Sequence, residues 1–588
     1  MKLFVKIQEK GKGIVDTALR FPVTVVFLLL TAVWNIVAIN QQNYDHYGKI
    51  VLSFVLGAFI YGTLQMVYER FVGKAMVRYI FMAVPFILSL IYYLLIKDGE
   101  FDVKVSIRTM VLFFCLFMAF LWVPVIKGRI NFNQSFMAAF KAFFMALLFS
   151  LVLFLGIVLI LATTNELITA VSDKAYAHGA NIVFVLLFPM IFLSLIPVYP
   201  REEDGEPEEL DEVLMKRVTP ARFLEALISY VTIPIATVFT VILLLYIIMN
   251  IRGEFWTDNL LEPLLVSYSI VVIIVYLLAS TVTNAVTLFF RRVFPKILLP
   301  VVLFQTIASI LKIQEAGISY GRYYVIMFGI FAIIASGWFC VRPVRSNGIV
   351  APVLIVLSLI SILPFIDVFT ISRSNQMNRL VNALERNGMF NGEAVIPKSD
   401  VPEKDRETII SAVRYLDEMR YTKEISWLKE YNEGYNFEKT FGFSEYNYDP
   451  GNGTEYISVT RKQASPIPVA GYDFMLQLFS YRKHDDTVVS SYELAGKTYT
   501  LSVEALSENE QEVLLKEGNQ ELIRFPLKEI YAKFENETGA KELDTPELTF
   551  TKENERAVIT VVAESISINI WQGGRSQQAD VDILVKIK

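Results

Sequence analysis

The stretch Val350–Thr370, VAPVLIVLSLISILPFIDVFT, separates two parts of the chain that differ in composition. It is long and apolar enough for a membrane-spanning helix, because about 20 apolar residues cross roughly 30 Å of hydrocarbon. Its one ionisable residue, Asp367, lies near its end. Similar segments precede it, and no segment after it is long enough to span. We therefore predict a polytopic α-helical membrane protein with about 11 spans, followed by a water-soluble domain.

Ten apolar segments precede Val350–Thr370, so the predicted membrane domain covers residues 21–370. Hydrophobic residues make up 54% of the 588 residues, more than an ordinary soluble protein carries. The ten segments are Phe21–Ile39, Ile50–Tyr68, Tyr79–Ile96, Thr109–Ile126, Ser135–Ala162, Asn181–Val198, Phe223–Met249, Leu264–Phe289, Ile297–Ile313 and Tyr323–Cys340.

The orientation of the spans follows from their connections, because cytoplasmic loops retain Lys and Arg. Residues 1–20 are basic and are predicted to be cytoplasmic. Each predicted inside loop then carries at least two basic residues, and an odd number of spans puts the C-terminal domain outside. We predict a multi-pass plasma-membrane protein with an extracytoplasmic C-terminal domain. The inside loops are Glu69–Arg78, Lys127–Gln134, Pro200–Arg222, Arg291–Lys296 and Val341–Ile349.

The residues after the last predicted span form a helical connector and then a domain rich in β-strands. Residues 371–430 contain two amphipathic patterns, Ser372–Gly388 and Ser399–Met419, which predict helices. Residues 431–588 change to short β-branched and aromatic runs, which predict an α+β domain with one helix, Pro526–Asn536. The predicted strands are Tyr456–Val459, Tyr472–Phe479, Val488–Leu494, Thr498–Val503, Glu521–Phe525, Leu548–Thr551, Ala557–Val562, Ile566–Trp571 and Val581–Ile587.

Three polar residues inside predicted spans are candidate functional residues, because such groups are expensive to bury in lipid. Lys141 lies near the cytoplasmic end of its span, where its long side chain is expected to reach the headgroups. Asn284 and Gln305 are uncharged and suit bridges between helices.

A second candidate cluster is predicted at the outer surface. The segment IQEAGISYGRYY, Ile313–Tyr324, joins two late spans and contains Glu315 and Arg322. Asp367 is predicted to lie at the same depth. We expect Arg322 to pair with Asp367, with Glu315 as a competing partner, because a guanidinium offers a planar fork to a carboxylate. Separate anchoring of each charge at the interface is the alternative.

The pattern Ile313-x-Glu315-x-Gly317-Ile318-Ser319-x-x-Arg322-Tyr323 resembles a motif of the bacterial membrane proteins grouped as the domain-of-unknown-function 4153 family. The likeness extends over most of the membrane half and includes the exit segment around Pro364 and Asp367. Family members often have Tyr where this chain has Ala316 and Thr where it has Ser319. The resemblance implies a bacterial integral membrane protein, and it brings no established activity.

The sequence predicts neither a catalytic site nor a cofactor or metal. His484 is the only histidine after residue 370, and no GxSxG elbow accompanies it. Both cysteines, Cys115 and Cys340, fall in apolar segments, so the C-terminal domain has no cysteine and too few Cys and His side chains for a zinc site. No concentrated basic stripe suits nucleic acid.

These observations favour a non-enzymatic envelope protein that anchors or senses. Its membrane half sits in the lipid bilayer, and its external domain is expected to bind a partner protein, a peptide or a cell-wall component. Dense aromatic residues between Tyr431 and Tyr448 are a candidate binding platform or, more simply, the edge of a core. The alternative is a transporter or exporter, which needs a hydrated cavity lined by residues such as Asn284 and Gln305.

Overall fold

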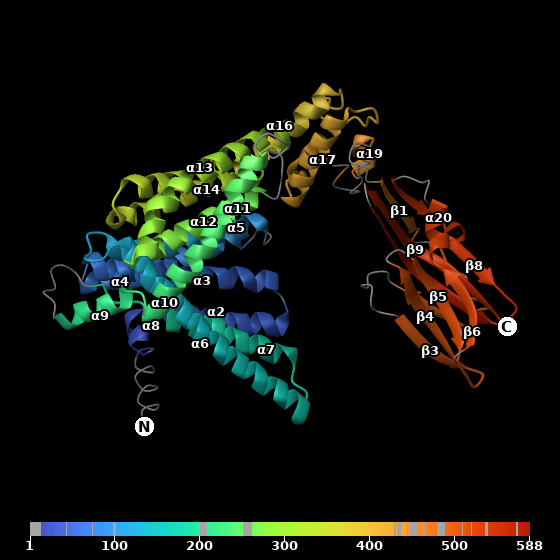
Figure 1. The fold of residues 1–588 in the computed structure, drawn as a ribbon, viewed down its shortest axis with the longest axis horizontal. Helices are drawn as coiled ribbons and strands as arrows, with labels where there is room; N and C mark the ends of the chain where they lie inside the picture. Colours follow the sequence, from blue (N-terminus) through green and yellow to red (C-terminus); the bar gives the residue numbers. More distant parts are fainter. Residues whose placement is uncertain are drawn as a thin grey trace. The chain divides into compact units, whose positions relative to one another are not determined.

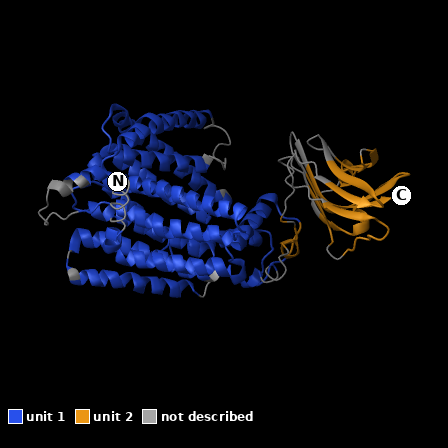
Figure 2. Cartoon of the chain, turned by 90° about the horizontal axis from the view of Figure 1, so that it is seen from below, with its two compact units in different colours: residues 1–396, 400–434 blue, residues 397–399, 435–588 orange. Residues whose placement is uncertain are grey.

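The computed structural model describes the chain except for residues 1–12, 14, 43, 73, 98–101, 200–207, 251–260, 429–430, 432–436, 444, 446–454, 463–464, 479–487, 508–509, 519, 535–538 and 572–573. Most of the basic N-terminal segment, the start of the Pro200–Arg222 loop and His484 therefore lie outside the described residues. The chain forms two compact units (Figure 2). Unit 1 contains Met1–Ile396 and Asp400–Gly434, and unit 2 contains Pro397–Ser399 and Tyr435–Lys588.

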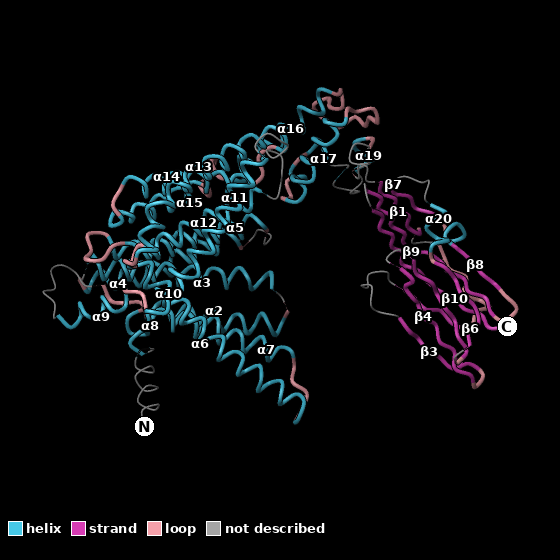
Figure 3. The backbone as a smooth tube through the Cα atoms, in the orientation of Figure 1, coloured by secondary structure: helices cyan, strands magenta, loops and turns pink. Residues whose placement is uncertain are grey.

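Unit 1 is a helical bundle with ten helical segments long and apolar enough to span a membrane, counted over the described residues. This confirms the predicted polytopic helical fold and makes the chain a multi-pass membrane protein. Figures 1 and 3 show the helices running beside one another, with α13 packed along α14. The helices are α2 (Pro22–Gln41), α3 (Tyr44–Val67), α4 (Ala75–Ile96), α5 (Val103–Trp122), α6 (Phe132–Leu167), α7 (Asp173–Ala180), α8 (Phe188–Leu195), α9 (Glu208–Val218), α10 (Arg222–Leu227), α11 (Ile233–Asn250), α12 (Leu261–Ala279), α13 (Ala285–Ala316) and α14 (Tyr320–Val341).

The predicted span Leu264–Phe289 is wrong at its C-terminal end. α12 stops at Ala279, and α13 begins at Ala285 after a polar stretch, Ser280–Asn284. Asn284 caps α13 by accepting a hydrogen bond from the backbone N–H of Thr287 at 3.0 Å. Short polar side chains offer the backbone such alternatives to continued helix, which is why the apolar run breaks here.

The predicted continuous span Val350–Thr370 is also wrong, because its helix breaks. α15 covers only Val350–Ile360, and α16 (Val368–Arg386) starts after a turn. Pro364 lies in that turn, has no N–H to donate and restricts the residue before it. Asp367 then caps α16 by accepting from the N–H of Thr370 at 2.7 Å.

The chain nevertheless passes from one end of the bundle to the other along η7 (Val344–Ile349) and α15. At the start of this passage, Asn133 donates to the carbonyl of Val344 at 3.0 Å. After it, the Ser361 hydroxyl donates to Tyr324 at 3.3 Å, at the opposite end of α14. This passage adds an eleventh crossing of the bundle to the ten long segments among the described residues.

The two ends of the bundle differ in chemistry. At the end that we call the basic end, Arg20 pairs with Glu69 at 2.7 Å and donates to the carbonyl of Ile196 at 2.9 Å. Arg70 donates there to the carbonyl of Ile126 at 2.9 Å. These cations satisfy carbonyl groups at helix ends, which have no partner within their own helices. The opposite end carries the turn between α13 and α14, and we call it the motif end.

A helical hairpin, α16 and α17 (Glu403–Glu418), follows the eleventh crossing within unit 1. Its helices pack through buried apolar side chains such as Leu380 and Leu416. The loop between them contributes Pro397–Ser399 to unit 2, where the N–H of Lys398 donates to the carbonyl of Phe441 at 3.0 Å. Two chain segments therefore join unit 1 to unit 2, this loop and the chain around Gly434.

Unit 2 contains two β-sheets whose buried side chains form one apolar core. The larger sheet has the strand order β2-β10-β9-β1-β7, with β8 also paired to β9, and the smaller has the order β3-β4-β5-β6. α20 packs against β9. The elements are β1 (Glu455–Arg461), β2 (Phe474–Leu478), β3 (Val488–Leu494), β4 (Lys497–Ser507), β5 (Glu510–Glu517), β6 (Gln520–Pro526), α20 (Lys528–Phe534), β7 (Gly539–Leu543), β8 (Thr549–Glu553), β9 (Ala557–Trp571) and β10 (Gly574–Ile587).

This confirms a C-terminal region rich in strands, with two differences from the predicted elements. Ala557–Val562 and Ile566–Trp571 are parts of one strand, β9. β5 and β7 were not predicted, because their Glu and Lys residues lower the strand signal. The predicted aromatic platform is largely core: Phe437, Phe441 and Phe443 are buried and pack together. Tyr446 and Tyr448 lie outside the described residues.

A β-bulge places two carboxylates side by side in unit 2. The register of β9 with β10 skips Glu564, which leaves this residue without a partner in the ladder. Arg461 binds Glu564 with two nitrogens, at 3.0 and 2.6 Å. Asp582 is 2% exposed, and burial and the neighbouring Glu564 raise its pKa to about 6.

We expect Asp582→Asn to raise the free energy of unfolding of unit 2 at pH 7 by about 2 kcal/mol. Because the folded pKa of Asp582 lies above its ordinary value of 3.8, the folded unit binds the extra proton. In the parent, the ionised Asp582 destabilises the folded unit, and this destabilisation decreases as the pH falls from about 6 to about 4. The free energy of unfolding of the parent should therefore rise over this range relative to that of the variant. Pulse proteolysis of the full chain in urea measures it, with Glu555→Gln as an exposed control. Equal pH profiles for parent and Asp582→Asn would contradict the prediction.

Candidate functional site at the motif end

The turn between α13 and α14 has a backbone that suits glycine. Gly317 follows the last residue of α13 and has φ 71° and ψ −174°. Residues other than glycine rarely adopt this backbone conformation. Ser319 then caps α14, and its hydroxyl accepts from the N–H of Arg322 at 3.3 Å. The motif Gly317-Ile318-Ser319 thus ends one helix and begins the next within three residues.

Side chains of α16 hold this turn by binding its main-chain N–H and carbonyl groups. The N–H of Ile318 donates to the side chain of Asn375 at 2.8 Å. Gln376 donates to the carbonyls of Ala316 and Ile318, each at 3.2 Å. Arg379 donates to the carbonyl of Ala316 at 2.8 Å. Gln376 and Arg379 follow Asn375 by one and four residues, so the three side chains lie on one face of α16. Together they bind the main chain of the turn.

α17 adds a further contact through a tyrosine. The hydroxyl of Tyr415 donates to Ser372 in α16 at 2.8 Å and accepts from the N–H of Tyr320 at 3.1 Å. Burial raises the pKa of Tyr415, so the hydroxyl keeps its proton and can make both bonds. One side chain therefore links α17, α16 and the start of α14.

The hairpin is attached a second time, to the start of α5. Asp367 is 1% exposed and pairs with Arg108, whose guanidinium also lies over the ring of Phe369 at 5.1 Å. The ammonium of Lys104 lies 4.0 Å from the ring centre of Tyr421, which follows α17. The hairpin is thus bound at two places on the motif end, by the turn and by α5. We call these two attachments together the clasp.

The predicted pair of Arg322 with Asp367 is wrong. Asp367 pairs with Arg108, and Arg322 instead donates to the carbonyl of Gly317 at 2.7 Å, five residues back along the chain. The sequence predicts that Arg322 and Asp367 lie at one depth in the membrane, but it gives no information on which cation the fold brings to Asp367. The side chain of Glu315 lies outside the described residues.

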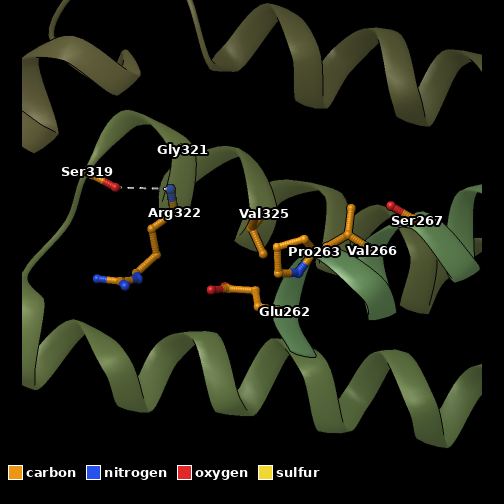
Figure 4. Close-up of a pocket in the computed structure, with 8 residues that line it drawn as sticks. All are labelled: Glu262, Pro263, Val266, Ser267, Ser319, Gly321, Arg322 and Val325. Atoms are coloured by element: carbon orange, nitrogen blue, oxygen red, sulfur yellow. Dashed lines mark hydrogen bonds between the residues drawn. The ribbon is translucent and has the colours of Figure 1, made fainter. Parts of the chain in front are cut away.

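A cavity of about 410 Å³ lies between the starts of α12 and α14 (Figure 4). Arg322 and Glu262 reach toward the same space within it, and Ser267 and Ser319 also line it. Arg322 Nε is buried without a hydrogen-bond partner among the described residues. The Glu262 carboxylate accepts from the hydroxyl of Ser309. A guanidinium and a carboxylate at one opening suit a small molecule that carries both charges.

The three polar residues predicted inside spans have separate environments. Lys141 donates to the carbonyls of Arg217 at 2.9 Å and Thr219 at 2.6 Å. Asn284 lies in the break before α13 and donates to the Ser229 hydroxyl at 2.7 Å. Gln305 is 1% exposed, and neither end of its amide has a hydrogen-bond partner among the described residues.

The residues that sequence reasoning missed are those that act on main-chain groups. Gln376, Arg379 and Tyr415 bind the motif turn, and their only sequence signal is a polar face on otherwise amphipathic helices. Arg108, the partner of Asp367, carries no signal of its own in the sequence. Within the described residues, no group of three or more His, Cys, Asp or Glu side chains is placed to hold a metal ion.

Comparison with known families covers the bundle and the clasp helix α16. A family model described as a domain of unknown function, DUF4153, matches residues 23–390, more than half of the chain. The match ends soon after α16, so α17 and all of unit 2 lie outside it. No curated protein and no solved structure is significantly similar to the chain. The chain therefore belongs to the DUF4153 family, as its motif between α13 and α14 predicted.

Proposed function

We propose that this protein is a non-enzymatic envelope protein whose membrane bundle anchors unit 2 and presents it to an external ligand or partner. The observation that supports this most directly is the clasp. Two independent sites on the motif end hold the hairpin from which the chain continues into unit 2. A flexible tether would not need side chains that bind specific main-chain groups of the bundle, as those of α16 do.

The same geometry suits sensing. The segments that join unit 2 to the bundle offer a covalent route for a signal, and both segments belong to or follow the hairpin. The hairpin in turn contacts α5, α13 and α14 through polar groups with fixed geometry. Binding at unit 2 can then act on the bundle by favouring one arrangement of the clasp.

In the proposed topology the basic end faces the cytoplasm and the motif end faces outward. The support is the charge on the loops, since Arg20, Arg70, Arg291 and Arg342 all lie at the basic end. With eleven crossings of the bundle, unit 2 then follows on the outer side. We further propose that its ligand is a partner protein, a peptide or a cell-wall component.

Cysteine labelling in intact spheroplasts tests this topology. We expect a membrane-impermeant maleimide to label Glu555→Cys in unit 2 without permeabilisation, because Glu555 is exposed. Lys216→Cys, exposed at the basic end, serves as the matched control and should label only after permeabilisation. The native cysteines are replaced by alanine in both variants. The reverse pattern would put unit 2 in the cytoplasm and end the envelope proposal.

Ligand capture tests the presenting role once the topology holds. Photo-crosslinkers placed on exposed positions of unit 2 in right-side-out vesicles should give defined adducts with envelope material. The same vesicles carrying crosslinkers on the basic end provide the control. Adducts of equal yield from both sides would argue against a specific ligand.

A transporter is the second candidate, and Gln305 is the observation that favours it. Its buried amide has no hydrogen-bond partner among the described residues and lies about two-thirds of the way along α13. Cavities lie near both ends of the neighbouring helix α12. Neither of these two cavities includes Gln305 or Asn284 in its lining. Labelling of Gln305→Cys by a water-soluble maleimide, with no labelling of its buried neighbour in Val302→Cys, would favour the transporter.

A further inference from the structure

A large cavity opens at the basic end, between α12, α13 and α14. Its volume is about 940 Å³, and four of its lining residues are cations. These are Arg291, Arg292, Lys296 and Arg342, and no lining residue is acidic. Apolar and aromatic side chains, among them Tyr276, Leu288, Phe289 and Phe339, complete the lining.

The four cations differ from the other basic residues at this end. Arg20, Arg70 and Lys141 are used inside the protein, where each binds a carbonyl or a carboxylate. Among the described residues, no carboxylate pairs with any of the four cations that line the cavity. Unlike Arg20, none of the four therefore has its charge neutralised by a carboxylate among the described residues.

The contacts that the four cations do make leave most of their donors free. Arg291 makes one long hydrogen bond, to the carbonyl of Ser280 at 3.4 Å, and its Nε is buried without a partner among the described residues. Arg342 lies over the ring of Trp338 at 5.3 Å, and this contact holds the guanidinium without using its N–H groups. Arg292 and Lys296 are exposed.

We propose that this cavity binds the phosphate headgroup of an anionic glycerophospholipid. Four convergent cations supply the charge and the N–H donors that phosphate oxygens require. The apolar part of the lining suits the start of the acyl chains, and the cavity lies where the apolar helices end. Basic recesses between membrane helices are typical sites for such headgroups. A soluble phosphate compound shares the headgroup chemistry but has no use for the apolar lining.

Native mass spectrometry of the detergent-solubilised full chain tests the site with phosphatidylglycerol as the probe. We expect Arg291→Gln, Arg292→Gln, Lys296→Gln and Arg342→Gln together to weaken its binding by about tenfold or more. A matched control removes the same charge at the same end, with Lys74→Gln, Lys127→Gln, Lys216→Gln and Arg345→Gln. All four control residues are exposed and none lines the cavity. Binding by the control should stay within about twofold of the parent.

Two further arms make the result decisive. The double variant Arg292→Gln, Lys296→Gln changes only exposed side chains, so it tests the site even if the quadruple variant does not fold. Inorganic phosphate should compete weakly with phosphatidylglycerol, and phosphatidylcholine should not compete. Equal losses in the lining and control variants would overturn the proposal, as would displacement of the lipid by phosphate at matched concentration.

Discussion

Replacing Gly317 by valine is expected to release the hairpin from the motif turn and to raise the labelling rate of a cysteine at position 372 about a hundredfold. Gly317 has φ 71° and ψ −174°, which costs a β-branched residue about 3 kcal/mol. A Cβ at this position would also lie 2.6 Å from Cδ of Arg379 and 2.7 Å from Nε2 of Gln376. The two side chains that hold the turn must then move.

The measurement uses Ser372→Cys in α16, because the side chain of Ser372 is fully buried against Tyr415 of α17. With Cys115 and Cys340 replaced by alanine, a maleimide reacts only when the hairpin opens. Gly321→Ala is the matched control, because Gly321 lies in α14 with open space around its Cα. The control should label at the parent rate. A folded Gly317→Val protein that also labels at the parent rate would show that the turn does not hold the hairpin.

Asp367→Ala is expected to lower the free energy of unfolding by about 3 kcal/mol, because it removes a buried ion pair and a helix cap. Asp367 is 1% exposed, while the Arg108 side chain is 46% exposed, so the loss stays at the lower end for a buried pair. Titration with SDS in mixed micelles measures the change.

A double-mutant cycle assigns the partner of Asp367. Arg108→Gln and Asp367→Asn should show a coupling energy of about 1.5 kcal/mol. Each single variant already loses the charged hydrogen bond between the two residues, so the double variant has no such bond left to lose. Arg322→Gln with Asp367→Asn is the control cycle, and its coupling should be near zero because Arg322 binds the Gly317 carbonyl. A larger coupling in the control cycle than in the test cycle would mean that the predicted Arg322 pair forms after all.

The clasp gives the family motif a structural role. The matched family region includes the turn Gly317–Ser319, Arg108 and α16, which are the parts that meet at the motif end. Tyr415 and all of unit 2 lie beyond the matched region. This division is that of a membrane domain with a clasp helix, to which unit 2 is attached as a separate domain.

The sequence by itself determined the membrane bundle, its basic loops and the strand-rich C-terminal region. The length of an apolar segment and the spacing of its polar residues are local properties of the sequence. A segment such as Val350–Ile360 can therefore be assigned to the membrane without knowing which helices it packs against. Local chemistry also marked Gly317 and Asp367 as special positions, although it assigned the wrong partner to Asp367.

The tertiary structure decided which groups meet. Arg108 and Asp367 are far apart in the chain, and only the packing of α5 against the crossing that contains α15 brings them together. The same holds for Gln376 on the motif turn, and for Arg342, which follows α14 and joins the three cations of α13 around the basic cavity. Partners set by long-range packing leave no period or spacing in the sequence, so a single chain read alone cannot assign them.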